Sequence, residues 1–198
     1  MSFPGGLLLV GALAGLLTAQ PVVAGTVEGH VRRPASSADL SNFVISVEDI
    51  EGPFPAPEQA AVMEQKELQF VPHVLAIQVG TTVEFPNSDP LSHNVFSISD
   101  VKRFNLGLYT RGTIRRLKFE KPGVVDLLCS VHLEMSAFIV VLKNPYFART
   151  GSDGAFRIDG VPAGRHRLRY WHERFPPQVL TVQVPETGSV TADFFVGK

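Results

Sequence analysis

Short apolar runs separated by glycines and prolines recur along most of this chain, and they limit what it can fold into. The 198 residues include 17 Gly and 15 Pro, spread between runs in which apolar and polar side chains alternate. Alternation with a period of two is typical of half-buried β-strands, and signals for helices are nearly absent. The hydrophobic content of 44% is that of a globular chain long enough for one large domain or two small ones. We therefore predict an all-β protein.

The first 24 residues form a segment of a different kind. An apolar run from Gly5 to Leu17 is too short to span a bilayer, and small residues precede a predicted cleavage point after Ala24. This order is typical of a secretory signal peptide, although no Lys or Arg precedes the apolar run. We predict a signal peptide over residues 1–24, a periplasmic or secreted mature protein and no stable membrane span after cleavage. An uncleaved anchor is the alternative.

The charge of the chain is nearly balanced, with a net charge of -1. Nucleic acid is therefore not an expected partner, because a polyanion needs a strongly basic footprint. Residues 102–121 differ from the rest, since Glu120 is their only acid. Their basic residues are Lys102, Arg103, Arg111, Arg115, Arg116, Lys118 and Lys121. A solvated face and a docking patch for an acidic partner are both open interpretations.

One loop brings three metal-ligating side chains close together in sequence. Cys129, His132 and Met135 are spaced Cys-x2-His-x2-Met, between strands predicted at residues 124–128 and 137–142. Cys129 is the only cysteine, so it cannot form an intramolecular disulfide, and its roles reduce to reactivity, metal ligation or packing. A tight loop between the two strands would let the three side chains converge on one ion.

A fourth ligand is predicted at His93. This residue follows a turn framed by Pro86 and Pro90 and begins a short predicted strand, residues 93–97. The 36 residues between His93 and Cys129 leave room for two or three strands that return the chain to the same end of a sandwich. We predict that the metal ligands are His93, Cys129, His132 and Met135.

The ligand types favour copper, with alternatives left open. Two imidazoles, a thiolate and a weak axial thioether suit copper in both oxidation states. Zinc on the two histidines and the cysteine remains open, as does simple packing of Cys129 and Met135 in the core. Glu134 is an alternative axial ligand, but neighbouring residues on an extended segment point in opposite directions. The histidines without ligand-like neighbours are His30, His73, His166 and His172.

The four ligands in this order, preceded by the stretches 80–85 and His93-Asn94-Val95, resemble the blue copper cupredoxins. The Cys-x2-His-x2-Met loop is most similar to that of amicyanin, although it lacks the prolines that amicyanins carry around the loop histidine. The resemblance covers roughly residues 61–142. It implies a Greek-key β-sandwich that holds one type 1 copper ion.

The same resemblance implies roles for single residues. His132 is expected nearest the surface, with its ring edge at the centre of an apolar patch through which electrons pass. Asn94 is expected to tie the His93 loop to the loop at Ser130, so that the ligands are held in place before the metal arrives.

The flanking residues resemble another family, the transthyretin-like carboxypeptidase regulatory-type domain. The motifs that carry this resemblance are Gly25 to Val31, Asp153 to Phe156 and Pro162 to Gly164. It implies a second, smaller β-sandwich built from both ends of the chain.

The domain layout follows from the two resemblances. We predict a cupredoxin domain over residues 59–146, inserted between a first part (25–58) and a second part (147–198) of the transthyretin-like sandwich. The competing layout is a cupredoxin with extra N-terminal strands and a separate C-terminal domain.

The functional expectation is electron transfer without catalysis. A site whose coordination positions are all filled by protein leaves none for a substrate, so we do not expect an enzyme. The expected partner is a redox protein, a cytochrome or a dehydrogenase by analogy with amicyanin. The alternative is a copper-binding or partner-binding module in which copper is stored, delivered or structural.

Overall fold

The computed structural model describes residues 23–33 and 39–197, and all of the regular elements in this part of the chain are β-strands. The all-β prediction is thus confirmed. The predicted signal peptide lies outside the described residues, apart from its last two. Across the described ranges, no helix has the length and apolar character needed to cross a membrane.

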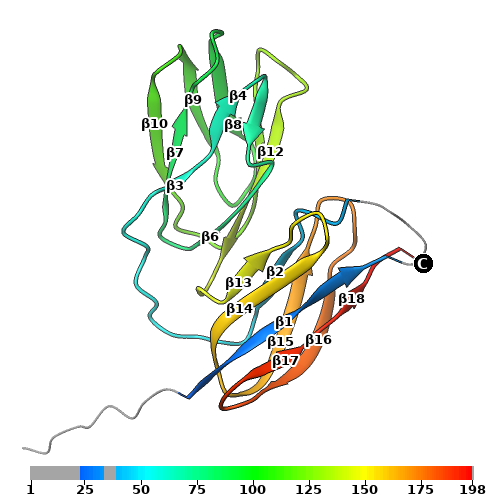
Figure 1. The fold of residues 1–198 in the computed structure, drawn as a ribbon. Coiled ribbons are helices and arrows are strands. Elements are labelled where there is room, and N and C mark those ends of the chain that lie inside the picture. The colour runs from blue at the N-terminus through cyan, green and yellow to red at the C-terminus, as the bar shows by residue number, and fades with distance from the viewer. Residues whose placement is uncertain (1–22, 34–38, 198) are drawn as a thin grey trace, which may run out of the picture.

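The middle of the sequence forms what we call the inner unit, strands β3 to β12 (Figure 1). Its strands are β3 (Ala61–Val62), β4 (Glu64–Lys66), β5 (Gln69–Val71), β6 (Val74–Gln78), β7 (Thr82–Pro86), β8 (His93–Ser97), β9 (Phe104–Tyr109), β10 (Ile114–Lys118), β11 (Gly123–Leu128) and β12 (Ser136–Leu142). They form a sheet in the order β6-β12-β11-β8-β9, a smaller sheet β10-β7-β3 and the hairpin β4-β5. Both sheets contribute to one apolar core.

The two ends of the chain together form the outer unit, strands β1, β2 and β13 to β18. Its strands are β1 (Ala24–Arg32), β2 (Val44–Val47), β13 (Phe147–Arg149), β14 (Ala155–Pro162), β15 (Gly164–Trp171), β16 (Gln178–Val184), β17 (Ser189–Thr191) and β18 (Phe194–Phe195). One sheet has the order β14-β1-β17, with β18 also paired to β1, and the other has the order β13-β2-β15-β16. Inward side chains of both sheets share a second apolar core.

Strands β1 and β2 therefore pair with strands that lie more than 100 residues later in the sequence. This is the pairing that a layout with an inserted inner unit requires. The exact domain boundaries and the transthyretin-like identity of the outer unit stay predictions.

The alternating apolar residues between 190 and 196 do not form one continuous strand. The structure has two short strands instead, β17 and β18, and both run parallel to β1. Between them the carboxylate of Asp193 accepts hydrogen bonds from the His30 N–H (2.9 Å) and the Arg32 Nε (2.8 Å), which interrupts the ladder. A Cβ at Gly29 would lie 1.8 Å from the Ala192 carbonyl oxygen, so this close crossing requires glycine.

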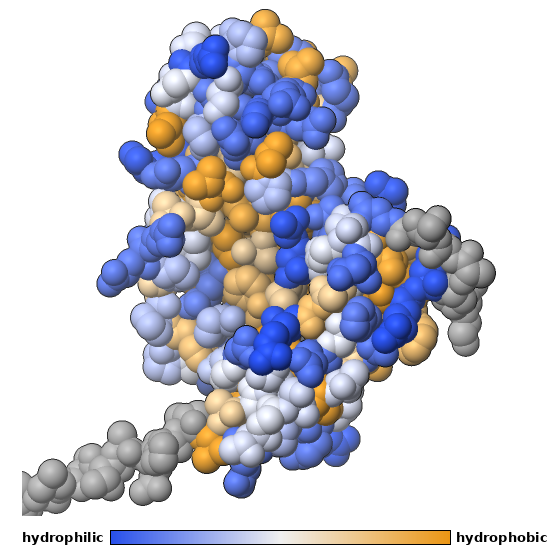
Figure 2. Space-filling model, viewed as in Figure 1, coloured by the Kyte–Doolittle hydropathy of each residue, from blue (hydrophilic) through white to orange (hydrophobic). Residues whose placement is uncertain are grey.

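The units meet where the lower ends of β6 and β12 approach β2 and β15 (Figure 1). A small buried cluster of Val44, Val74 and Val140 lies there, with Phe138 and Trp171 packed against it. Figure 2 shows apolar surface at the waist between the units, with hydrophilic side chains beside it. Because Phe138 of β12 belongs to this junction, the Ser136 end of the strand lies about 7 Å beyond it along the strand.

Candidate metal centre

Three strands of the larger inner sheet bring the predicted ligands to one end. His93 is the first residue of β8, Cys129 follows the last residue of β11, and Met135 immediately precedes β12. Strand β11 is hydrogen-bonded to both others, because Leu128 pairs with Phe96 of β8 and with Ser136 of β12. The strand ends that carry the ligands are therefore neighbours, at the end of the unit away from the junction.

The ligand loop is held closed by its own backbone and by the neighbouring strand. The Cys129 N–H donates to the Met135 carbonyl (3.3 Å), and the Met135 N–H donates to the His132 carbonyl (3.0 Å). The Ser130 N–H donates to the Asn94 Oδ1 (3.3 Å). This last bond confirms the prediction that Asn94 ties the two loops together.

The three strong ligands converge. The Nδ1 atoms of His93 and His132 face each other at 3.0 Å, and one ligand atom from each of these residues and Cys129 lies within 4.8 Å of the others. His93 and Cys129 are buried, and His132 is half-buried. Facing imidazole nitrogens beside a thiol form a donor set that fits a soft or borderline cation. Among the described residues this is the one cluster of three or more His, Cys, Asp or Glu groups with such geometry.

Met135 and Glu134, the two candidates for the axial ligand, differ in solvent exposure. Met135 is buried in the inner core next to Cys129, whereas Glu134 is exposed. Leu133 and Glu134 form a turn, not an extended segment, and the turn leaves Glu134 exposed. The burial of Met135 favours it over Glu134 for the interior of the site.

Asp89 is a site residue that the sequence reasoning missed. Its buried carboxylate accepts hydrogen bonds from the His93 Nε2 (2.7 Å) and from the backbone N–H groups of Glu67 (2.6 Å) and Leu68 (3.0 Å). Burial acts to raise the pKa of Asp89, but hydrogen bonds from Leu68, His93 and Glu67 outweigh it and hold the pKa below its usual value. Because a carboxylate only accepts, the His93 Nε2 carries the proton and Nδ1 is left free to bind a metal.

Little in the sequence indicates this role of Asp89. The turn after β7 contains Asn87, Ser88 and Asp89, and all three residue types are common in turns for local reasons. The spacing of four residues between Asp89 and His93 was visible, but the direction of the carboxylate was not.

A network of buried polar side chains holds the turn that precedes His93. The Asn87 side chain donates to the carbonyls of Leu91 (2.9 Å) and Tyr109 (3.0 Å). The Tyr109 hydroxyl accepts from the Gln65 Nε2 (2.5 Å) and donates to the Phe85 carbonyl (3.1 Å). Burial raises the pKa of Tyr109 to about 12. The loop that carries His93 is therefore fixed to β7 and β9.

Apolar side chains surround the half-buried His132. Val131 and Leu133 flank it in sequence and are 50% and 87% exposed. Three more exposed leucines lie on segments bonded to the ligand loops, at the β4-β5 turn, in the loop before His93 and on β9. We call these five residues the end patch, and they are Leu68, Leu91, Leu108, Val131 and Leu133.

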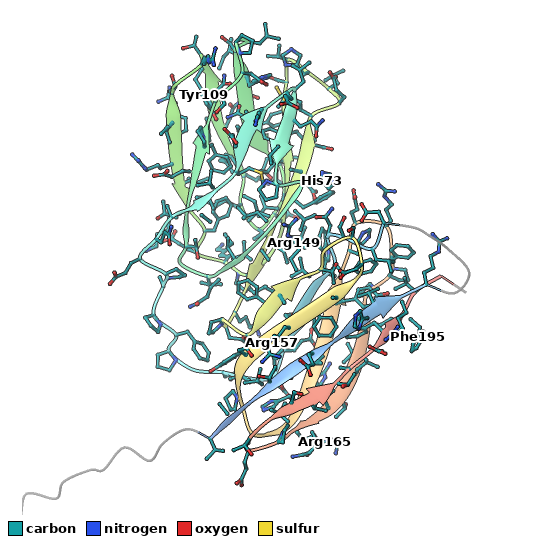
Figure 3. All side chains as sticks on the ribbon, viewed as in Figure 1. His73, Tyr109, Arg149, Arg157, Arg165 and Phe195 are labelled. Carbon is teal, nitrogen blue, oxygen red and sulfur yellow. The ribbon has the colours of Figure 1, made fainter. Side chains whose placement is uncertain are left out.

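The remaining histidines lie elsewhere, as predicted. The His73 Nε2 is 3.1 Å from Glu173 of the outer unit, at the side of the inner unit in Figure 3. His30 lies beside Asp193, His166 bonds to Asp49, and His172 stacks on Phe43 with its centroid 4.2 Å away. None of the four belongs to the ligand cluster.

Comparisons with known proteins agree on part of the chain. Residues 57–142 match the family of copper binding proteins, plastocyanin/azurin family. Among solved structures, the copper-containing nitrite reductase (NirK) from Thermus scotoductus SA-01 is 29% identical over 48% of this chain, with a TM-score of 0.42. The match spans 25% of the nitrite reductase. No curated protein sequence matches the chain.

Amicyanin structures also match. A copper(I) form of one amicyanin variant is 24% identical, covers 49% of this chain and 97% of the amicyanin, and has a TM-score of 0.40. A copper(I) form of another variant is 25% identical with the same coverage and TM-score. Residues 57–142 thus resemble a copper-binding domain of the plastocyanin/azurin type. Its His93, Cys129 and His132 cluster, with Met135 nearby, is consistent with a type 1 copper site.

Proposed function

We propose that this protein is an exported type 1 copper protein that carries single electrons between redox partners. The observation that carries the proposal is the convergence of the His93 Nδ1, the His132 Nδ1 and the Cys129 thiol within 4.8 Å. Copper bound by these groups and Met135 would supply a one-electron couple. The family match over residues 57–142 supports the choice of metal.

The surrounding residues favour fast electron transfer because they hold the ligands in one arrangement. Asn94 fixes the ligand loop through Ser130, and Asp89 fixes the ring of His93. Ligands held by such outer hydrogen bonds need little movement when the charge at the site changes. The burial of His93 and Cys129 keeps water away from the thiolate.

The route to a partner runs through His132. Its ring is half-buried within the end patch, so an apolar contact can exclude water there and bring a partner's cofactor close to the ring. By analogy with amicyanin, the partner is a cytochrome or a dehydrogenase of the periplasm. The proposal includes cleavage after Ala24 and the insertion of domain 59–146 into the outer unit.

The proposal is tested by adding Cu(II) to the purified protein and recording the visible spectrum. An intense blue band from thiolate-to-copper charge transfer is expected, and a colourless or pale product contradicts the assignment. The matched control is His73→Ala, which removes a histidine outside the cluster and leaves the band unchanged. Loss of the band in this control would overturn the ligand set.

A second candidate function is a partner-binding module in which copper is stored, delivered or structural. The groove of about 560 Å³ at the junction favours it, because that volume is within the range of ligand sites. The groove is lined by Val140 of β12 and by Arg167, Arg169 and Trp171 of β15. A reversible redox titration separates the candidates, because a carrier cycles between oxidation states at a potential within reach of cytochromes. A potential out of that reach would favour the storage, delivery or structural role.

A further inference from the structure

The positive charge of this nearly neutral chain is concentrated on one side of the inner unit. Residues 102–121 contain seven Lys and Arg against one acid, whereas the whole chain has a net charge of -1. The remainder of the protein is therefore net negative. The basic segment forms β9, the turn that follows it and β10, which are edge strands of the two inner sheets.

The turn between β9 and β10 lies next to the metal centre. The Gly112 N–H donates to the Asn87 carbonyl (2.7 Å), and the Asn87 N–H donates to the Thr113 carbonyl (3.1 Å). Asn87 belongs to the turn that leads to His93. Arg111, which precedes Gly112, is thereby placed at the end of the unit that carries the ligands.

Arg115 is tied to the same end through Tyr109. Its guanidinium lies 5.7 Å from the centroid of the Tyr109 ring, and Tyr109 is the cross-strand partner of His93. Figure 3 shows Tyr109 in the upper part of the inner unit. Leu108, a member of the end patch, precedes Tyr109, so apolar and basic side chains are neighbours here.

Several of these cations are not neutralised within the protein. Arg103 pairs with Asp100, and Arg116 pairs with Glu84 at 2.8 Å. Among the described residues 102–121, the exposed cations with no carboxylate within 4.0 Å are Arg111, Arg115, Lys118 and Lys121. We call the two at the end of the unit that carries the ligands, Arg111 and Arg115, the basic rim, because Lys118 pairs with Thr82 at the other end of β10.

The opposite side of the end patch carries acids. Glu67 lies in the β4-β5 turn, and Glu134 lies in the ligand loop just before β12. Figure 1 shows β9 and β10 on one side of the inner unit and β4 and β12 on the other. The surface around His132 is thus positively charged on one side, apolar in the middle and negatively charged on the other side. This arrangement fixes the orientation of a charged partner.

We infer that the partner is a redox protein that presents an acidic patch to the basic rim and an apolar spot to the end patch. That the partner is a redox protein rests on the proposed function, whereas the charge of its docking surface rests on the basic rim alone. Exposed, unpaired cations stay largely hydrated when they face a partner's carboxylates at the solvent-exposed edge of an interface. They also increase the rate of association with an acidic partner. The orientation then places the partner's cofactor near the His132 ring.

The inference is tested by binding, which does not require copper. Ferric cytochrome b5 serves as an acidic haem-protein probe and is titrated by calorimetry into the metal-free and the copper-loaded protein. The ionic strength is about 10 mM, because charges interact over about 30 Å at this salt concentration. We expect Arg111→Glu together with Arg115→Glu to weaken binding at least tenfold, with the difference lost near 0.5 M salt. If the double variant does not fold, Arg111→Glu alone replaces it in the test, because Arg111 lies in an exposed turn.

Arg165→Glu, at the far end of the outer unit in Figure 3, is the matched control for Arg111→Glu, because it also reverses one charge. It leaves binding unchanged if docking occurs at the basic rim. Absence of binding by the native protein, or an equal loss in Arg165→Glu, overturns the inference. If binding behaves as expected but copper gives no blue band, the docking surface stands and the proposed electron transfer fails.

Electron transfer gives a second measurement on the copper-loaded protein. Each ferrous cytochrome b5 gives one electron to copper(II), leaving ferric haem and copper(I), and the bleaching of the blue band reports the rate. We expect charge reversal at the basic rim to slow this reaction about tenfold at low salt. Reduction by hexaammineruthenium(II), a cationic one-electron donor, is expected to speed up instead, and slowing with both donors contradicts a charge effect.

Discussion

The interiors of the two units are built from different kinds of side chains. Most of the buried polar residues lie in the inner unit, and those around the turn and strand that carry His93 are Gln65, Asn87, Asp89, His93 and Asn94. The core of the outer unit is apolar, formed by residues such as Val27, Ile45, Leu168 and Val182. Buried polar groups cost free energy unless they are hydrogen-bonded, so folding alone does not require them. Their position beside the ligands indicates that they hold the site.

The largest expected effect that tests this contrast comes from the thiol. Cys129→Ser keeps the size of the side chain but removes the thiolate, and we expect complete loss of the blue band on addition of Cu(II). The free energy of unfolding of the metal-free protein should change by no more than about 1 kcal/mol, measured by urea denaturation. A blue product from this variant would show that Cys129 is not a ligand.

A pair of equivalent truncations separates stability from metal binding. Leu127 in the inner core and Leu168 in the outer core are both fully buried. Replacing either with Ala removes the same atoms and is expected to lower the free energy of unfolding by about 2–5 kcal/mol. Because Leu127 lies two residues before Cys129, only Leu127→Ala should change the spectrum of the copper-loaded protein. An altered spectrum in Leu168→Ala would show that the outer core also sets the geometry of the site.

The same contrast explains what the sequence could predict. Alternating side chains located most strands of both units, and ligand types at characteristic spacing located His93, Cys129, His132 and Met135 as candidates. Contacts between distant residues were less accessible, because period-two alternation defines a face and not a partner. The parallel pairing of β17 and β18 with β1 depends on Asp193 and Gly29, and neither residue is distinctive in sequence.

A substitution at Asp89 tests the hydrogen bonds that support the ligands rather than the ligands themselves. Asp89→Asn keeps the shape of the side chain but removes the charge that accepts from His93 and two backbone N–H groups. We expect copper affinity to fall about 10–100-fold, measured by competition with a chelator. The control is Asp193→Asn, which removes a carboxylate with similar backbone and side-chain bonds in the outer unit. An equal loss of copper affinity in the control would mean that the effect is not local.

The smallest expected effect comes from two buried tyrosines, one in each unit. The Tyr109 hydroxyl bonds to Gln65 and Phe85, whereas the Tyr170 hydroxyl has no hydrogen-bond partner among the described residues. Tyr109→Phe removes one hydrogen bond from each of these groups, although Gln65 keeps its bond to the Pro86 carbonyl (3.2 Å). It should destabilise the metal-free protein by about 1–2 kcal/mol, measured by urea denaturation. Tyr170→Phe removes only an unpaired hydroxyl and should change stability by less than about 0.5 kcal/mol or increase it.

The pH dependence of the same variants sharpens the difference. The folded state holds Tyr109 protonated up to a pKa of about 12, while the unfolded chain ionises near pH 10, so native stability falls between these values as pH rises. The loss from this one group is at most about 2 kcal/mol at pH 12. Tyr109→Phe removes this contribution and should flatten the decline above pH 10. If the slope of stability against pH is unchanged, the Tyr109 phenol is not the buried group that links the β7-β8 turn to the interior. Other hydrogen bonds would then hold the polar interior of the inner unit.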